Sequence, residues 1–246
     1  MRNIQDILQF RDDISPFLVH LTKDANGRNA SQVLRAIVEA RSITPGATNV
    51  SDIRYGGNTL QMDEQDLRDF FRACCFTETP LDEVHCLLDI GSREVNLKPY
   101  GLVFLKSRLV GRGVSPVLYL NNSAADQDDV AALLFGLKTI NDRAARKVLP
   151  LFAVFGQKIQ APNAAERPGG QVDFRWEREW RRPAYMGDLG FDQHDVFVGL
   201  CPHEEIDTFE QLWPEVRFVD PRRPMKWYAT KLIQARERLG ITHSVV

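Results

Sequence analysis

Short apolar runs, rather than long periodic stretches, organise this chain. Apolar and β-branched residues bounded by turn signals predict strands at residues 16–22, 74–79, 101–106, 114–120, 172–181, 195–200 and 216–219. The remaining pattern predicts helices at residues 4–10, 29–41, 62–73, 126–139, 205–212 and 225–238. Because the strands do not alternate one for one with long helices, we expect an α+β fold with a mixed, largely antiparallel sheet and flanking helices.

The segment 172–181, VDFRWEREWR, has the most regular strand pattern in the sequence. Successive side chains of a strand point to opposite faces, so one face is mostly apolar and the other is charged. The apolar face holds Val172, Phe174, Trp176, Arg178 and Trp180, and the charged face holds Asp173, Arg175, Glu177, Glu179 and Arg181. The pattern therefore predicts that Glu177 and Glu179 lie side by side, each flanked by a guanidinium.

This acid pair has two interpretations. In a working site, one carboxylate orients or polarises a nucleophile, while Arg175 and Arg181 hold a phosphate or keep the acids ionised. In the alternative, the charges are only the solvent face of an antiparallel sheet. Two tryptophans on the apolar face, Trp176 and Trp180, would anchor the strand in the core. They favour a working site, because a catalytic acid needs rigid support.

A second candidate is the strand 16–22, from which His20 and Thr22 project on one face. An imidazole and a hydroxyl both donate and accept hydrogen bonds, so this pair suits a ribose or an amide, although a structural role is the alternative. Cys74 and Cys75 are adjacent and cannot readily form a disulfide with each other. We expect at least one of them to be buried as a small apolar residue.

Several familiar signatures are missing from the sequence. Its glycines form neither a P-loop nor a dinucleotide-binding fingerprint, and its cysteines and histidines lack zinc-site spacing, so we expect no metal. The charged start MRNIQDILQFRDD and the lack of any window of about 18 apolar residues predict no signal peptide and no membrane segment. Four cysteines without the spacing of a secreted scaffold favour a cytoplasmic protein.

Composition limits the partners of the chain. The 246 residues include 31 Lys and Arg against 33 Asp and Glu, a net charge of −2, which removes any bulk attraction to nucleic acid or anionic membrane. A polyanion would need a local basic patch, and residues 175–182 and 222–228 mix basic with aromatic residues in that way. We expect a single α+β domain over 1–246, with a core at about 16–204 and a C-terminal helical extension at 205–246.

Four short blocks occur in a fixed order: CFTETPL at 75–81, YG at 100–101, PVLY at 116–119 and EREWR at 177–181. In this order they resemble the AbiGi-type family of abortive phage-resistance proteins. The resemblance covers residues 20–202 and depends on the order of the blocks. It implies one half of a phage-exclusion system, often the antitoxin, and implies no reaction.

A wider similarity is to the ADP-ribosyltransferase-like fold, which includes DarT-like enzymes that modify nucleic acid. Such proteins place a histidine or arginine on an early strand to hold a ribose, an aromatic or hydroxyl residue on a middle strand, and a glutamate on a late strand. His20 with Thr22 matches the early position, and Tyr119 or Thr77 matches the middle one. Glu177-Arg-Glu179 matches the late position, where the glutamate is frequently part of an E-x-E pair.

By this resemblance Glu179 would hydrogen-bond the ribose 2′-hydroxyl and stabilise oxocarbenium-like charge as nicotinamide departs, and Glu177 would orient the acceptor. The implied cofactor is NAD, consumed as a substrate, and the acceptor is a nucleic acid or a protein. We therefore expect a phage-defence protein that acts as an ADP-ribosyltransferase.

The alternative is a non-catalytic antitoxin or sensor that binds a partner protein or nucleic acid through the same fold. Its contact surface would consist of the tryptophans and a row of arginines, Arg175, Arg178, Arg181 and Arg182. A nuclease is a third option, but the sequence lacks an Asp and His constellation suited to Mg²⁺ or general-base cleavage.

Overall fold

The computed structural model of the chain describes residues 14–46, 48, 69–88, 96–121, 136–155 and 175–241. By its internal contacts the chain divides into two compact units. Unit 1 contains residues 1–43, 76–112 and 190–246, and unit 2 contains residues 44–75 and 113–189. The sequence-based expectation of a single domain stays a prediction. The predicted helices at 4–10 and, for the most part, 62–73 and 126–139 lie outside the described residues.

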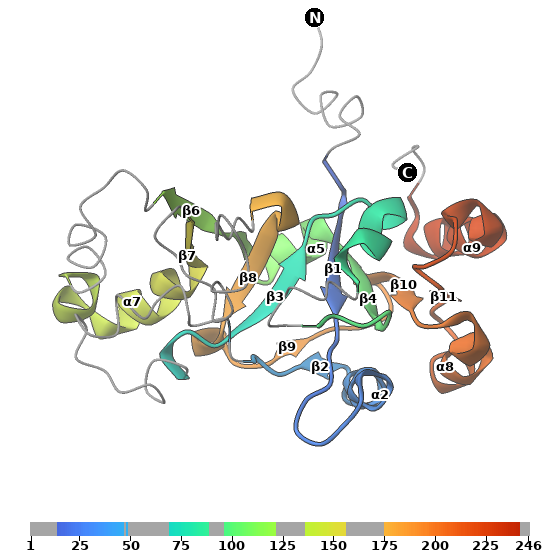
Figure 1. Ribbon diagram of the computed structural model, residues 1–246, viewed down its shortest axis with the longest axis horizontal. Coiled ribbons are helices and arrows are strands. Elements are labelled where there is room, and N and C mark those ends of the chain that lie inside the picture. Colours follow the sequence, from blue (N-terminus) through green and yellow to red (C-terminus); the bar gives the residue numbers. More distant parts are fainter. Residues whose placement is uncertain are drawn as a thin grey trace, which may run out of the picture. The chain divides into compact units, whose positions relative to one another are not determined.

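Seven strands form a mixed, mostly antiparallel sheet in the order β11-β10-β4-β1-β3-β8-β5 (Figure 1). Their bounds are β1 (Phe17–Leu21), β3 (Ala73–Thr77), β4 (Gly101–Leu105), β5 (Ser115–Pro116), β8 (Glu179–Pro183), β10 (Val196–Leu200) and β11 (Phe218–Val219). Two smaller ribbons pair β2 (Ser42–Ile43) with β9 (Leu189–Gly190) and β6 (Leu118–Asn121) with β7 (Phe152–Phe155). Together with the helices, this confirms the predicted α+β class and the largely antiparallel sheet.

Unit 1 is built around β4, whose five residues GLVFL are apolar or glycine because the strand has a neighbour on each side. β1 and β10 pair with it antiparallel, and β10 pairs with β11 parallel. Phe17 of β1 stacks on Phe197 of β10 with ring centroids 4.3 Å apart. Gly101 is required by this packing, because a Cβ there would lie 2.2 Å from the carbonyl oxygen of His20.

The helices of unit 1 are α2 (Ala30–Ala40), α5 (Lys106–Gly111), α8 (Ile206–Leu212) and α9 (Ala229–Leu239), with 3₁₀ turns η3 (Leu81–Leu87), η8 (His203–Glu205) and η9 (Met225–Tyr228). Three of these helices, α2, α8 and α9, lie at predicted positions, whereas α5 is not predicted by the sequence pattern. Asn29 caps α2 in a capping box with Gln32, and Leu34 and Val38 form its buried face. Arg41, in the left-handed conformation at φ 50°, ends the helix.

Unit 2 contains the 3₁₀ turns η4 (Leu149–Leu151), η6 (Arg175–Glu177) and η7 (Ala184–Met186), the helix α7 (Asp142–Val148) and the strands β5 to β8. β5 pairs antiparallel with β8, and β6 pairs in parallel with β7. The predicted strand 114–120 is therefore two short strands, which belong to different sheets.

The strand predicted at 172–181 is wrong in its first described part. Residues 175–177 form a 3₁₀ turn closed by a hydrogen bond of 3.1 Å from the Arg178 N–H to the Arg175 carbonyl oxygen. Arg178 then takes a positive φ of 46°, and the strand begins only at Glu179. Glu177 and Glu179 therefore do not lie on one face of a single strand, as the alternation predicts. Glu179 and Arg181 do lie on the same face of β8, as the pattern predicts.

Candidate functional site: a carboxylate cluster in unit 2

A bidentate ion pair lies at the start of β8. Arg181 donates from Nε to Oε1 of Glu179 at 2.8 Å and from Nη2 to Oε2 at 2.7 Å. The side chains of Arg181 and Glu179 are only 8% and 18% exposed, so water screens the pair weakly. Two parallel charge-assisted bonds hold the carboxylate in one plane and one direction.

Arg181 is itself anchored by the main chain of unit 2. Its Nη1 donates to the carbonyl oxygens of Pro150 at 2.9 Å and Phe152 at 3.2 Å. Burial alone would lower the pKa of the guanidinium, but the Glu179 carboxylate outweighs that effect and raises it. Arg181 is thus a permanent cation whose bonds are used inside the protein, so its geometry fits the predicted pairing with the acid and does not suit the alternative, a phosphate contact.

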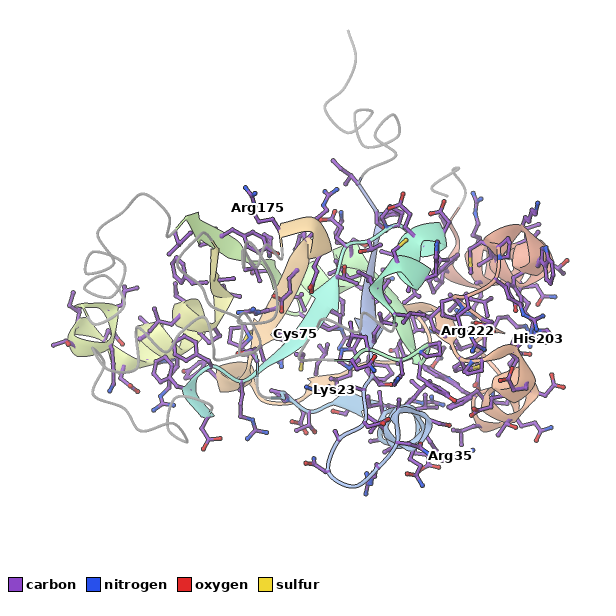
Figure 2. All side chains as sticks on the ribbon, in the orientation of Figure 1. Lys23, Arg35, Cys75, Arg175, His203 and Arg222 are labelled. Atoms are coloured by element: carbon purple, nitrogen blue, oxygen red, sulfur yellow. The ribbon has the colours of Figure 1, made fainter. Side chains whose placement is uncertain are left out.

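Two further polar side chains contact Glu179. The Tyr119 hydroxyl accepts a hydrogen bond of 3.0 Å from the Glu179 main-chain N–H, and burial raises the pKa of Tyr119 to about 12. The thiol of Cys75, on the neighbouring strand β3, donates to the carbonyl oxygen of Ala73 at 4.0 Å and also interacts with the Glu179 side chain (Cys75 is labelled in Figure 2). Burial, followed by the Glu179 charge, raises the pKa of that thiol well above its ordinary value. The thiol beside the carboxylate is therefore neutral.

We call Cys75, Tyr119, Glu177, Glu179 and Arg181 the Glu179 cluster. Glu177 belongs to it because its charge helps to raise the pKa of Tyr119, after burial and the charge of Glu179. It comes from η6 and not from β8, and its side chain is buried. Arg175 also comes from η6 but is exposed (Figure 2). The structure thus brings together four of the eight predicted site residues, and Cys75 joins them.

The three remaining predicted residues, His20, Thr22 and Thr77, lie in unit 1. The buried Thr22 hydroxyl donates to the carbonyl oxygens of Ala30 and Tyr100, both at 3.1 Å. The buried Thr77 hydroxyl is 2.7 Å from that of Thr79. These contacts support structural roles for both threonines.

His20 is partly exposed on β1, and its ring centroid lies 5.6 Å from that of Phe76. Thr77, on β3, pairs with Val19 of β1 within unit 1. His20 and Glu179 belong to different units, so the hypothesis that they face one hollow stays a prediction.

The row of arginines in the binding alternative is only partly available. Arg181 and Arg182 are buried. Arg182 donates to the carbonyl oxygens of Met186, at 2.8 Å, and Gly187, at 2.5 Å. Arg178 is partly exposed and Arg175 is exposed, so two of the four arginines remain as surface groups. The prediction of a contact surface made from all four arginines is therefore wrong.

Cysteine reactivity gives a direct check of the cluster. Burial raises the pKa of Cys74 to about 12 and also raises those of Cys75 and Cys201, whereas the Cys86 residue is exposed. The thiolate is the reactive form, so we expect iodoacetamide at pH 8 to modify Cys86 roughly tenfold or more faster than the other three in the folded protein. Peptide mass spectrometry over a time course measures this, with urea-unfolded protein as the control. Rapid labelling of Cys75 in the folded protein would contradict the raised pKa of its thiol.

Among the described residues, no group of three or more His, Cys, Asp or Glu side chains could hold a metal ion. In the same part of the chain, no helix has the length and apolar character that a bilayer crossing requires. The sequence matches no protein-family model, no curated protein and no solved structure.

Proposed function

We propose that the protein is an ADP-ribosyltransferase of phage-defence type, which transfers ADP-ribose from NAD to a nucleic-acid or protein acceptor. The observation that carries the proposal is the Glu179 carboxylate, which Arg181 holds by two hydrogen bonds. A carboxylate that is both ionised and fixed in direction stabilises positive charge that develops beside it, and it needs no reorganisation during the reaction.

The proposed reaction breaks the bond between the nicotinamide nitrogen and C1′ of the ribose. The bonding electrons leave with nicotinamide, positive charge develops at C1′ and the ring oxygen, and an acceptor nucleophile forms the new bond to C1′. Glu179 stabilises that charge and accepts a hydrogen bond from the ribose 2′-hydroxyl. Glu177 orients the acceptor, and the proton that the acceptor loses passes to water.

The chemistry of the cluster fits a ribose. Glu179 keeps part of its side chain exposed, and each carboxylate oxygen that accepts one bond from Arg181 can accept another from a hydroxyl.

Calorimetric titration with NAD tests the first step of the proposal. We expect micromolar binding to the wild-type protein, with slow release of nicotinamide when an acceptor is present. Absence of binding, together with co-purification of the product of a neighbouring gene, would instead favour the non-catalytic antitoxin or sensor.

A further inference from the structure

Unit 1 contains a basic segment that contributes no residue to the Glu179 cluster. Residues 217–231 include five basic residues and a single acidic one, Asp220. Asp220 is buried and accepts two hydrogen bonds from the Arg222 guanidinium, at 2.9 and 2.8 Å. Arg222 balances this charge and also lies 3.9 Å from the exposed Glu204 carboxylate of η8. The other four cations, Arg217, Arg223, Lys226 and Lys231, leave the segment with a net positive charge.

Trp227 is the large apolar side chain on this segment. It is 64% exposed, a high value for an indole, because large aromatic side chains normally bury most of their area. The next residue, Tyr228, is buried, and its hydroxyl lies 3.2 Å from Nδ1 of His203. The 3₁₀ turn η9 is therefore anchored at Tyr228, next to the exposed ring of Trp227. The Arg223 guanidinium lies 5.7 Å from the centre of the Trp227 ring.

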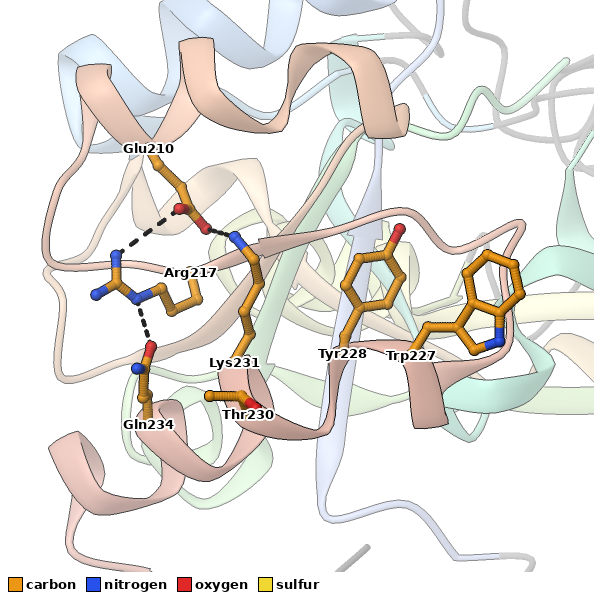
Figure 3. A pocket seen from close by; sticks show the side chains of 7 residues that line it. All are labelled: Glu210, Arg217, Trp227, Tyr228, Thr230, Lys231 and Gln234. Atoms are coloured by element: carbon orange, nitrogen blue, oxygen red, sulfur yellow. Dashed lines mark hydrogen bonds and ion pairs between the residues drawn. The ribbon is translucent and has the colours of Figure 1, made fainter.

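A surface pocket of about 360 Å³ adjoins this ring (Figure 3). Trp227 and Tyr228 line it together with a polar group: Glu210, Arg217, Thr230, Lys231 and Gln234. Glu210 contacts both cations, through a hydrogen bond from Lys231 and an ion pair of 3.7 Å with Arg217. One carboxylate faces two cations, so the pocket keeps a net positive charge and offers hydrogen-bond donors beside an indole.

We propose that this surface, comprising Arg217, Arg223, Lys226, Trp227 and Lys231, binds single-stranded nucleic acid. A base stacks on the Trp227 indole, and the cations around it contact the neighbouring phosphates. A duplex is excluded as the preferred ligand, because its bases are already stacked on one another and their faces are covered. The net charge of −2 for the whole chain confines the attraction to this surface.

The inference goes beyond the proposed transfer reaction, because binding at Trp227 needs neither NAD nor Glu179. It is tested in the absence of NAD with a fluorescein-labelled oligothymidylate of about ten nucleotides, by fluorescence anisotropy at several salt concentrations. We expect Trp227→Ala to weaken binding by about 5- to 150-fold, and Trp227→Phe to restore part of the loss. Arg223→Ala and Lys226→Ala should each reduce the slope of log Kd against log salt by about 0.7.

The matched control is Arg28→Ala combined with Arg108→Ala, which removes two exposed cations of unit 1 outside the basic segment. We expect this double variant to bind like the wild type. Three results would each overturn the proposal: no binding at low salt, equal affinity of the Trp227→Ala variant and the wild type, or equal affinity for a duplex of the same length. Since NAD is absent throughout, the outcome is independent of whether the transferase proposal holds.

Discussion

Replacing Arg181 with methionine is expected to lower the free energy of unfolding by about 3–5 kcal/mol. Methionine fills much of the same volume but leaves the Glu179 carboxylate without its cation, in a setting where that carboxylate is only 18% exposed. It also removes the donor to the carbonyl oxygens of Pro150 and Phe152. Urea denaturation followed by circular dichroism measures the change.

A second variant shows how much of the loss comes from the stranded charge. Glu179→Gln combined with Arg181→Met removes both charges, and we expect it to recover more than half of the stability lost by Arg181→Met alone. The matched control is Arg146→Met, since Arg146 pairs with Asp142 on α7 at a site where both side chains are about half exposed. We expect that control to change stability by less than about 1 kcal/mol. Equal losses of stability for Arg146→Met and Arg181→Met would show that the buried pair stabilises the protein no more than an exposed pair.

Replacing Glu179 with glutamine is expected to reduce NAD-dependent transfer by about 100- to 1,000-fold. Glutamine keeps the shape of the side chain but removes the negative charge that stabilises the transition state. Nicotinamide release, measured by chromatography, reports the rate, and calorimetry reports whether NAD still binds. A fall in the rate with little change in NAD affinity is the expected pattern, because the carboxylate acts mainly in the transition state.

Two checks separate this effect from loss of folding. The Glu179→Gln protein should give a single cooperative unfolding transition, and the rate should be compared at a temperature where it is fully folded. Glu237→Gln, at an exposed position on α9, provides a control with the same chemical change. Unchanged nicotinamide release from a folded Glu179→Gln protein would end the catalytic role of Glu179.

Local sequence signals predict much of unit 1. β4 and β10 are runs of apolar residues and glycine, β1 is apolar except for His20, and α2 has a capping box followed by a buried apolar face. In these elements the local preference and the tertiary packing agree, so the pattern of the sequence is sufficient.

In the segment around Glu179, the local pattern of apolar and polar residues does not predict the structure. Alternation from 172 to 181 predicts a continuous strand, but Arg178 adopts a left-handed conformation that residues other than glycine rarely take. The 3₁₀ turn before it forms through one local hydrogen bond, which a two-residue alternation does not reveal. The spacing of Glu179 and Arg181 survives this change, because both residues follow the turn.

The contacts between different segments could not be read from the sequence. Cys75 is about a hundred residues from Glu179 along the chain, and its interaction with that side chain depends on β3 being next to β8 in the sheet. Cys74 is the buried member of the adjacent pair and Cys75 is partly exposed, so the expected burial of one cysteine does not indicate this interaction. The resemblance places Tyr119 at the middle position as a cofactor-binding residue, whereas in the structure its hydroxyl accepts a hydrogen bond from the main-chain N–H of Glu179.

Arg181 bonds both the carbonyl oxygens of Pro150 and Phe152 and the Glu179 carboxylate, so it links the backbone of residues 150–152 to the acid. A shift of this backbone would move the guanidinium, and the carboxylate bonded to it would turn as well. The orientation of the Glu179 side chain therefore depends on the proline-containing turn η4, whose side chains are not part of the Glu179 cluster.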